Sequence, residues 1–227
     1  MKTIDIKQIL KLNEKFYQLV SNDFSRTRQR PWKGWGRVAQ VINKTLNDKI
    51  KNNREITVLD IGCGNGRFYG YLKGKIENIT YTGLDTNNDL LQEACKNFSS
   101  TKNKTTFINF DAIGDISGIT GKYNVIVAFG LTHHIPVSQF RNNWFKSLPN
   151  LMDSNNALLI LTFWEFEKEP GDYLLSWSDN KEAARFCHRY SDEEISEIIK
   201  IYDDIGIKLL EEYQSDNENL YLIFGNI

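Results

Sequence analysis

The sequence predicts an α/β fold, a doubly wound and mostly parallel seven-stranded sheet with N-terminal helices and an antiparallel C-terminal hairpin. From residue 56 onward, short apolar runs alternate with segments of helical spacing, and the first run ends in a glycine loop. Strands separated by helices need crossover connections, which favour a parallel sheet covered on both faces. Only the residues "QSDNE" separate the last two runs, so we expect those two strands to pair antiparallel.

Two helices are expected before the first strand. Apolar side chains recur at helical spacing over residues 5–22, and a second helix is predicted from Trp35 to about Lys51. Pro31 interrupts the pattern between them. Strands are expected at residues 56–62, 79–85, 105–111, 123–130, 157–163, 207–213 and 219–225, and further helices at 67–74, 87–97, 137–150 and 192–204.

Composition favours one compact domain without a strong overall charge. The 227 residues, 41% of them hydrophobic, can build one sizeable core. Because 28 basic residues nearly balance 29 acidic ones, no global positive field would draw the protein to a nucleic acid or an anionic membrane. A polyanion would therefore need a local patch. One candidate is "SRTRQRPWKGWG" (25–36), in which four cations surround two tryptophans.

Cysteine usage and the N-terminus indicate a cytoplasmic, soluble protein. Cys63, Cys95 and Cys187 are odd in number and form no CxxC pair, which disfavours a disulfide framework and a zinc site. The first sixteen residues mix Lys with Asp and Glu and contain no apolar signal segment. No apolar run approaches the length that a bilayer requires.

A glycine loop, "DIGCGNG" (60–66), follows the first predicted strand. Ligands of doubly wound sheets bind at this edge, and glycines allow a tight turn and a close approach of the ligand. The spacing is neither GxGxxG nor a Walker loop. The carboxylate of Asp60 would repel a pyrophosphate and favour a cationic ligand.

Acidic residues also end the next two predicted strands. Asp85 lies about twenty residues after the loop, where a carboxylate can accept hydrogen bonds from the hydroxyls of a ribose. Asp111, followed by Ala112, ends the third strand at a place from which an adenine amino group could be read. These positions predict a nucleoside site.

Four stretches, "VLDIGCGNG", "GLD", "FDA" and "VIVAFGLTHHI", together resemble class I S-adenosylmethionine-dependent methyltransferases over residues 55–165. The resemblance implies a Rossmann-like fold and S-adenosyl-L-methionine as cofactor. It implies that the loop glycines wrap the methionine part, Asp85 holds the ribose, Asp111 meets the adenine and Phe129 borders the cofactor. The full set expected to bind the cofactor is Arg28, Trp32, Asp60, Gly62, Cys63, Gly64, Gly66, Asp85, Thr86, Asp111, Ala112 and Phe129. An ordinary doubly wound domain with incidental glycines is the alternative.

The resemblance divides the single domain, residues 1–227, into four functional parts. Residues 1–54 form an N-terminal helical segment that acts as a substrate lid, and residues 55–163 form the cofactor-binding core. Residues 164–190 are a substrate-side insertion, and residues 191–227 supply the C-terminal helix and hairpin.

Other stretches resemble one branch of that family, the tRNA wobble-uridine methyltransferases that act on 5-carboxymethyluridine. "FSRTRQRPW" (24–32) is similar to the segment F-S-x-T-R-x-x-P-W of that branch, and "LTHHI" (131–135) to its I-H-H-L segment. "GDYLLSW" and "RFCHRYSDEEI" resemble two further motifs. Lys33, Ser176 and Cys187 depart from the pattern of that branch.

If the methyl acceptor is a carboxylate, the protein needs few catalytic groups. With a pKa near about 4 the carboxylate is ionised at neutral pH and needs no general base. It needs alignment with the methyl carbon and cations that hold it, for which Arg26, Arg28, Arg185, His188 and Arg189 are available. We expect Arg28 to hold the carboxylate of the cofactor instead. The predicted catalytic residues are His133, Arg26, His188 and Arg189.

Simpler interpretations accompany these assignments. Trp32 and Trp35 can be packing anchors, and the basic run can be a solvated face. His133 and His134 are adjacent, so one is expected to face the site and the other to be structural. No third ligand stands near them in the sequence, so no metal is expected. Cys63 is expected to be a small packed residue rather than a nucleophile.

Three functions remain open from the sequence. The first is a methyltransferase that esterifies a carboxymethyl group on a tRNA wobble uridine, with tRNA as partner and, as in eukaryotic members of the family, a small activator protein. The second is a small-molecule O- or C-methyltransferase, because this fold serves many acceptors. The third is a non-catalytic cofactor-binding partner protein.

Overall fold

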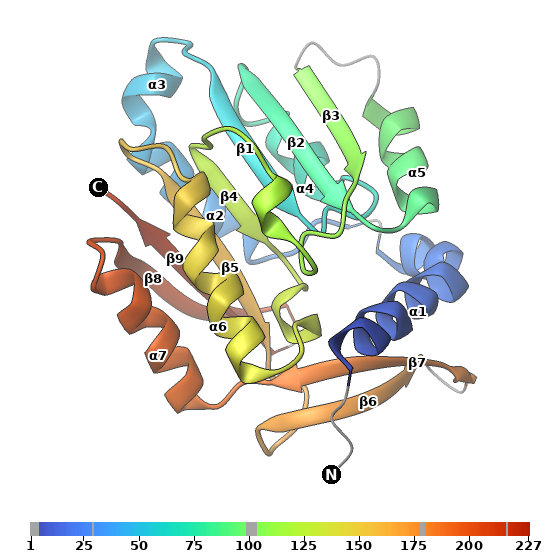
Figure 1. The fold of residues 1–227 in the computed structure, drawn as a ribbon. Coiled ribbons are helices and arrows are strands. Elements are labelled where there is room, and N and C mark those ends of the chain that lie inside the picture. The colour runs from blue at the N-terminus through green and yellow to red at the C-terminus, as the bar shows by residue number, and fades with distance from the viewer. Residues whose placement is uncertain (1–4, 29, 99–103, 178–179, 217) are drawn as a thin grey trace.

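The computed structural model describes residues 5–28, 30–98, 104–177, 180–216 and 218–227. Its main sheet is built from β1 (Ile56–Ile61), β2 (Ile79–Asp85), β3 (Lys104–Asn109), β4 (Val125–Ala128), β5 (Leu158–Trp164), β8 (Lys208–Ser215) and β9 (Asn219–Gly225). These strands lie in the order β3-β2-β1-β4-β5-β9-β8 (Figure 1). Strands β1 to β5 pair in parallel, whereas β9 is antiparallel to both β5 and β8. The predicted parallel sheet with an antiparallel C-terminal hairpin is confirmed.

Helices cover both faces of the sheet. The helices are α1 (Ile6–Thr27), α2 (Trp35–Thr45), α3 (Asn47–Lys51), α4 (Arg67–Leu72), α5 (Asn88–Phe98), α6 (Ser138–Ser147) and α7 (Asp192–Asp203), with short 3-10 turns η1 (Ile116–Gly118), η2 (Thr132–His134) and η3 (Leu148–Leu151). Alternate residues of a strand point to opposite faces. Val125 and Val127 therefore join the core under α2 and α4, while Ile126 and Ala128 join the core under α6 and α7.

The order of the strands reverses between β1 and β4. β1 pairs with β2 on one side and with β4 on the other, so connections leave this point toward both halves of the sheet. In doubly wound sheets the crevice beyond the strand ends at such a reversal is where ligands bind. Here the loop at Gly62–Gly66 leaves β1, and Phe129 follows β4.

A separate two-stranded hairpin, β6 (Gly171–Trp177) and β7 (Asn180–Arg189), lies inside the segment predicted as a substrate-side insertion. These two strands were not predicted from the sequence. An isolated hairpin has little stability of its own. It is supported by α1, which lies beside β7 (Figure 1), with Phe16 and Val20 packed against Ala183 and Trp177.

Several boundaries differ from the prediction. Helix α1 runs five residues beyond the predicted end at residue 22, so Arg26 lies on its last turn. The single helix predicted from Trp35 is two helices, because the backbone of Leu46 leaves the helical region while its side chain is buried in the core. No helix in the described parts of the chain has both the length and the hydrophobicity needed to cross a membrane.

Candidate active site

A cavity of about 1530 Å³ opens beyond the carboxyl ends of β1, β2 and β4. Its walls come from α1, from the loops that follow these strands and β3, and from Trp164 at the end of β5. Residues 30–33, Arg185 of β7 and Asp216 of the β8–β9 turn also line it. The strand order therefore places the cavity where a ligand is expected.

Two of the three glycines in the loop, Gly64 and Gly66, have different roles. Gly62, Gly64 and Gly66 all have positive φ, at 82°, 54° and 76°, which only glycine adopts without strain. A Cβ on Gly64 would meet nothing nearer than Leu90 at 3.9 Å, so the space beside it is open. A Cβ on Gly66 would approach Phe98 to 2.9 Å, and Gly66 is not part of the cavity wall. Gly64 thus leaves room for a ligand, whereas Gly66 allows the loop to pack on α5.

Asp85 connects the loop to the end of β2. Its carboxylate accepts a 2.8 Å hydrogen bond from the N–H of Gly64 and a 2.9 Å hydrogen bond from the N–H of Asn87. Burial raises its pKa, while these hydrogen bonds lower it. Each carboxylate oxygen keeps a second lone pair that can accept a hydroxyl of a bound nucleoside. Thr86, next in the chain, also lines the cavity.

Asp60 does not take the place predicted for it. It is 2% exposed, accepts a hydrogen bond from the hydroxyl of Tyr81, and lies outside the cavity wall. Burial, with a further contribution from Asp85, raises its pKa to about 7 against the effect of the Tyr81 hydrogen bond. We therefore revise its role from cofactor binding to holding β1 and β2 together beneath the loop.

Other predicted cofactor residues do lie in the cavity wall. Asp111 accepts hydrogen bonds from the N–H groups of Ile113 and Gly114 and shapes the loop after β3. Phe129 is 6.1 Å from the ring of Trp32, and both line the cavity. The remaining predicted members of the wall are Gly62, Cys63 and Ala112. The thiol of Cys63 is buried and its pKa is raised well above the ordinary value, which suits packing rather than nucleophilic attack.

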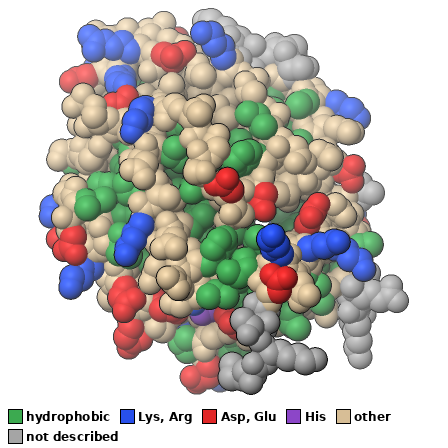
Figure 2. Space-filling view, viewed as in Figure 1, with side chains coloured by type: hydrophobic (Ala, Val, Ile, Leu, Met, Phe, Trp, Pro, Cys, Tyr) green, Lys and Arg blue, Asp and Glu red, His purple; other side chains and the backbone are tan. Residues whose placement is uncertain are grey.

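Basic side chains gather on one wall of the cavity. Among the described residues, eight basic and five acidic side chains line it, although the whole chain has a net charge of −1. Six of the eight come from α1 and the segment after it: Lys7, Lys11, Arg26, Arg28, Arg30 and Lys33. On the molecular face drawn in Figure 2, acidic and basic side chains are interspersed. The excess of positive charge is therefore a local property of the cavity.

Arg26 and Arg28 are placed differently within that wall. The guanidinium of Arg28 lies 4.4 Å from the ring centre of Phe24 and 5.1 Å from that of Trp177, and burial lowers its pKa. Arg26 is largely exposed and pairs with Asp23 at 3.1 Å. Arg28 thus lies inside the cavity, whereas Arg26, which was predicted to be catalytic, lies at its rim, and we withdraw that assignment.

Both His133 and His134 line the cavity, so the prediction that only one faces the site is wrong. Their rings lie 4.1 Å apart on η2, a 3-10 turn. Neighbouring residues of such a turn are about 120° apart around its axis, unlike the opposite faces of a strand. Burial keeps both imidazoles neutral, and lowers the pKa of His134 to about 3.

The hydrogen bonds of His134 fix its tautomer. Its Nδ1 lies 2.9 Å from the carbonyl oxygen of Phe186, an acceptor, so Nδ1 carries the proton and donates. Its Nε2 then accepts from the hydroxyl of Tyr17 at 2.7 Å. The Tyr17 oxygen in turn accepts from the guanidinium of Arg185 at 3.2 Å. Tyr17 was not predicted as a site residue, since it stands in an ordinary helical pattern.

Ligand atoms of His133, His134 and Cys187 lie within 4.8 Å of one another, which is a spacing that could attract a metal ion. The chemistry of the cluster does not favour one. Both ring nitrogens of His134 are already hydrogen-bonded, and the cationic Arg185 lies beside the thiol of Cys187. Burial raises the pKa of that thiol to about 11, so it is not a ready thiolate ligand.

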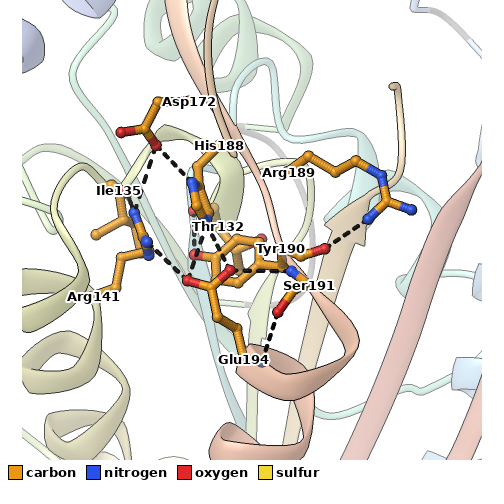
Figure 3. A network of polar contacts seen from close by, with 9 residues as sticks. All are labelled: Thr132, Ile135, Arg141, Asp172, His188, Arg189, Tyr190, Ser191 and Glu194. Atoms are coloured by element: carbon orange, nitrogen blue, oxygen red, sulfur yellow. Dashed lines mark hydrogen bonds and ion pairs between the residues drawn. The ribbon is translucent and has the colours of Figure 1, made fainter. Parts of the chain in front are cut away.

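His188 and Arg189, both predicted to be catalytic, do not reach the cavity. His188 Nδ1 lies 2.6 Å from Asp172, and its Nε2 lies 3.0 Å from Glu194 (Figure 3). Arg189 donates to the carbonyl oxygens of Glu167 and Tyr190. Because both ring nitrogens of His188 face carboxylates, the imidazolium form is favoured, and that form has no lone pair to act as a base. We therefore withdraw the catalytic assignment of both residues.

Comparison with known proteins agrees with this geometry. A family profile described as "Methyltransferase domain" matches residues 26–203. A protein of Encephalitozoon cuniculi (strain GB-M1), named as a candidate methyltransferase, is 22% identical over 220 residues, 92% of each chain. The tRNA (carboxymethyluridine(34)-5-O)-methyltransferase ALKBH8 of Mus musculus is 24% identical over 167 residues, which are 72% of this chain and 22% of that protein.

A solved structure also shares the fold. Magnesium protoporphyrin IX methyltransferase (ChlM) from Synechocystis PCC 6803, crystallised with bound SAM, has a TM-score of 0.64 and 17% identity, with full coverage of both chains.

Proposed function

The chain belongs to the methyltransferase-domain family, and on that premise we propose that it transfers a methyl group from S-adenosylmethionine to a carboxymethyl group on the wobble uridine of a tRNA. S-adenosylmethionine is the methyl donor. When bound, it supplies a methyl group activated by a sulfonium centre.

The residues present in the cavity fit this cofactor. Gly64 leaves open space for the methionine part, and Asp85, with Thr86 beside it, offers carboxylate lone pairs to the ribose. Asp111 and Ala112 border the place for the adenine, and Phe129 and Trp32 add an aromatic wall. Cys63 and Gly62 complete the loop, and Arg28 is available for the cofactor's carboxylate.

The basic side chains on the cavity wall are the main reason for proposing tRNA as the methyl acceptor. Phosphate contacts dominate the affinity of proteins for nucleic acids, and here α1 and the segment after it supply the cations although the chain as a whole has a net charge of −1. The likeness to ALKBH8, whose name states a carboxymethyluridine substrate, supports the same acceptor. A small activator protein would add surface for the tRNA.

A carboxylate acceptor also suits the neutral histidines. A carboxylate is ionised without a base, so the protein's task is to hold and align it. His133 and His134 cannot serve as cationic groups near neutral pH, which leaves the guanidinium groups to meet the negative charge.

Transfer of a radiolabelled methyl group from S-adenosylmethionine tests this function. The protein is incubated in parallel with bulk tRNA and with a metabolite extract, each with and without a lysate fraction that can supply an activator. We expect label in tRNA, and mass spectrometry of its nucleosides should identify a methyl ester at the wobble uridine. Label only in the metabolites would indicate a small-molecule methyltransferase, and binding of S-adenosylmethionine without any transfer would indicate a non-catalytic partner.

A further inference from the structure

Three residues of the cavity wall each carry a buried side-chain nitrogen that has no hydrogen-bond partner in the described part of the chain. These nitrogens are Asn13 Nδ2, His133 Nδ1 and Arg185 Nε. Their residues are 7%, 5% and 9% exposed. Buried polar groups in native proteins are nearly always paired, so unpaired ones beside a cavity need a partner from outside the chain, either a water molecule or a ligand. One further such atom, Trp35 Nε1, lies outside the cavity wall.

The three nitrogens belong to one end of the cavity, between α1, η2 and β7. His133 and Arg185 both contact Trp164. The ring centre of His133 and the guanidinium carbon of Arg185 each lie 5.3 Å from the ring centre of Trp164. Asn13 is tied to the residue after Arg185, because its Oδ1 accepts a 2.7 Å hydrogen bond from the N–H of Phe186. The hairpin β6–β7 therefore brings together residues that are far apart in the sequence.

Neighbouring contacts hold these donors in place. The N–H of Phe186 requires an acceptor, so the amide oxygen of Asn13 faces it and the amide nitrogen is left for a ligand. Arg185 donates from one terminal nitrogen to Tyr17 and lies 4.9 Å over the ring of Phe16. The Nε of Arg185 remains free for a ligand.

Two members of the set are donors without matching acceptors, and the third can donate as well. The amide nitrogen and the guanidinium Nε can only donate, and a neutral His133 donates from Nδ1 in one of its tautomers. Such a set calls for a ligand that is rich in acceptors, and the fixed charge of Arg185 selects an anion. A singly charged planar carboxylate matches three donors and one cation at a lower desolvation cost than a dianionic phosphate.

We propose that Asn13, His133 and Arg185 form a carboxylate-binding subsite for the methyl acceptor. The identity of the acceptor rests on the proposed function, whereas the subsite rests on the unpaired donors alone. Holding one oxygen of the carboxylate there would leave the other directed along the cavity.

Nuclear magnetic resonance of the imidazole groups can test the subsite without tRNA, because the chain contains only three histidines. The ¹⁵N-labelled protein is titrated with phenylacetate and, separately, with phenylacetamide, which has a similar shape and no charge. We expect phenylacetate to shift the His133 signals and to bind at least about tenfold more tightly than the amide, as for one charged hydrogen bond. The signal of His188, which lies outside the cavity, should not move.

Asn13→Asp is the variant that tests the subsite most directly. An aspartate keeps the acceptor for the N–H of Phe186 but replaces the free donor by a negative charge next to Arg185. Phenylacetate binding should weaken by about tenfold or more, while the affinities for phenylacetamide and S-adenosylmethionine stay unchanged. Asn43→Asp, on the exposed surface of α2, makes the same change of charge away from the cavity and should alter none of these affinities.

Equal binding of the two probes by the wild-type protein would overturn the subsite, and would mean that water satisfies the three donors. The subsite would also be contradicted if Asn13→Asp prefers phenylacetate over phenylacetamide as strongly as the wild-type protein does. If phenylacetate is selected as expected but tRNA accepts no methyl group, the subsite stands and the proposed function fails. If Asn13→Asp methylates tRNA as well as the wild-type protein does, the proposed function stands and the subsite is contradicted.

Discussion

The backbone N–H of Gly64 donates a 2.8 Å hydrogen bond to the carboxylate of Asp85. This contact joins the middle of the glycine loop to the end of the neighbouring strand, and the N–H groups of Gly62 and Cys63 reinforce it by donating to the carbonyl oxygen of Leu84. The loop and the strand end are therefore one rigid unit. A ligand that binds Asp85 also meets the loop in a fixed position.

Asp85→Ala should weaken binding of S-adenosylmethionine by about 1–3 kcal/mol, since hydrogen bonds to a buried charged group are lost. Isothermal titration calorimetry measures the dissociation constant directly. Asp203→Ala is a suitable control, because it removes an exposed carboxylate that pairs with Lys208 far from the cavity. An unchanged dissociation constant for Asp85→Ala would show that another group holds the ribose.

Alanine substitutions should separate the two kinds of loop glycine. Gly66→Ala forces a positive φ on alanine, at about 1–2 kcal/mol, and adds a clash with Phe98, so the free energy of unfolding should fall. Gly64→Ala carries similar strain without a clash, and its new methyl group faces the open cavity, so it should also weaken cofactor binding.

Urea denaturation and calorimetry together distinguish these effects. Gly74→Ala is the control, because a Cβ there meets nothing within 4 Å and no positive φ is involved. That variant should be neutral or slightly stabilised. Equal stability losses for Gly66→Ala and Gly74→Ala would contradict the packing role of Gly66.

The cofactor half of the site could be predicted because its chemistry is local in the sequence. The glycines of the loop and the acids at two strand ends follow directly from apolar runs, and parallel strands bring these ends together. Asp60 could not be placed in the same way. Its position two residues before Gly62 lies on the strand, and only the packing of Tyr81 shows that its carboxylate is occupied beneath the loop.

The acceptor half depends on contacts between distant segments. Arg185 and His188 stand three residues apart in one motif, yet only Arg185 reaches the cavity. The sequence contained one usable signal that was missed, at Asn13. It lies in the buried stripe of α1 with Ile9, Phe16 and Val20, and a polar residue in such a stripe is more informative than an apolar one.

The stability of the protein should depend on pH through His188. Burial and the nearby Arg141 guanidinium both lower the pKa of His188, but the hydrogen bonds to Asp172 and Glu194 outweigh them, so the pKa is raised (Figure 3). A raised pKa contributes stability that is complete below the ordinary value of 6.5 and is lost as pH rises through the folded value. For Asp172 and Glu194 the pKa is lowered, so their contribution is lost as pH falls below the ordinary values of 3.8 and 4.5.

The difference in unfolding free energy between wild type and His188→Gln should therefore be largest between pH 4.5 and 6.5 and should shrink above that range. Urea denaturation at about pH 5.5, 7 and 8.5 measures it. Asp203→Asn, which breaks an exposed ion pair, should show a small and constant difference over the same range. A constant difference for His188→Gln would mean that the imidazole is not held as a cation.

Arg28 and Arg30 should have separable functions, since the structure places them differently. The guanidinium of Arg28 is half-buried on Phe24 and Trp177, whereas Arg30 is exposed and its carbonyl oxygen accepts from Arg67. Arg28→Ala should lower turnover or cofactor affinity at every salt concentration, because a buried group acts with little screening. Arg28→Lys should not restore it, since an ammonium cannot reproduce the planar contact with two rings. Arg30→Ala should chiefly weaken binding of tRNA and reduce the salt dependence of that binding, as for a lost phosphate contact.

Steady-state rates on purified tRNA at two salt concentrations, with cofactor affinity measured separately, test this separation. Arg26→Ala is a matched control at the rim, where Asp23 already neutralises the side chain, and should have the smallest effect of the three. Equal losses at Arg28 and Arg30 that vanish at high salt would mean that both belong to one electrostatic surface. If neither variant loses activity, the basic wall is only a solvated face. The choice of tRNA over a small acceptor would then depend on the likeness to ALKBH8 alone.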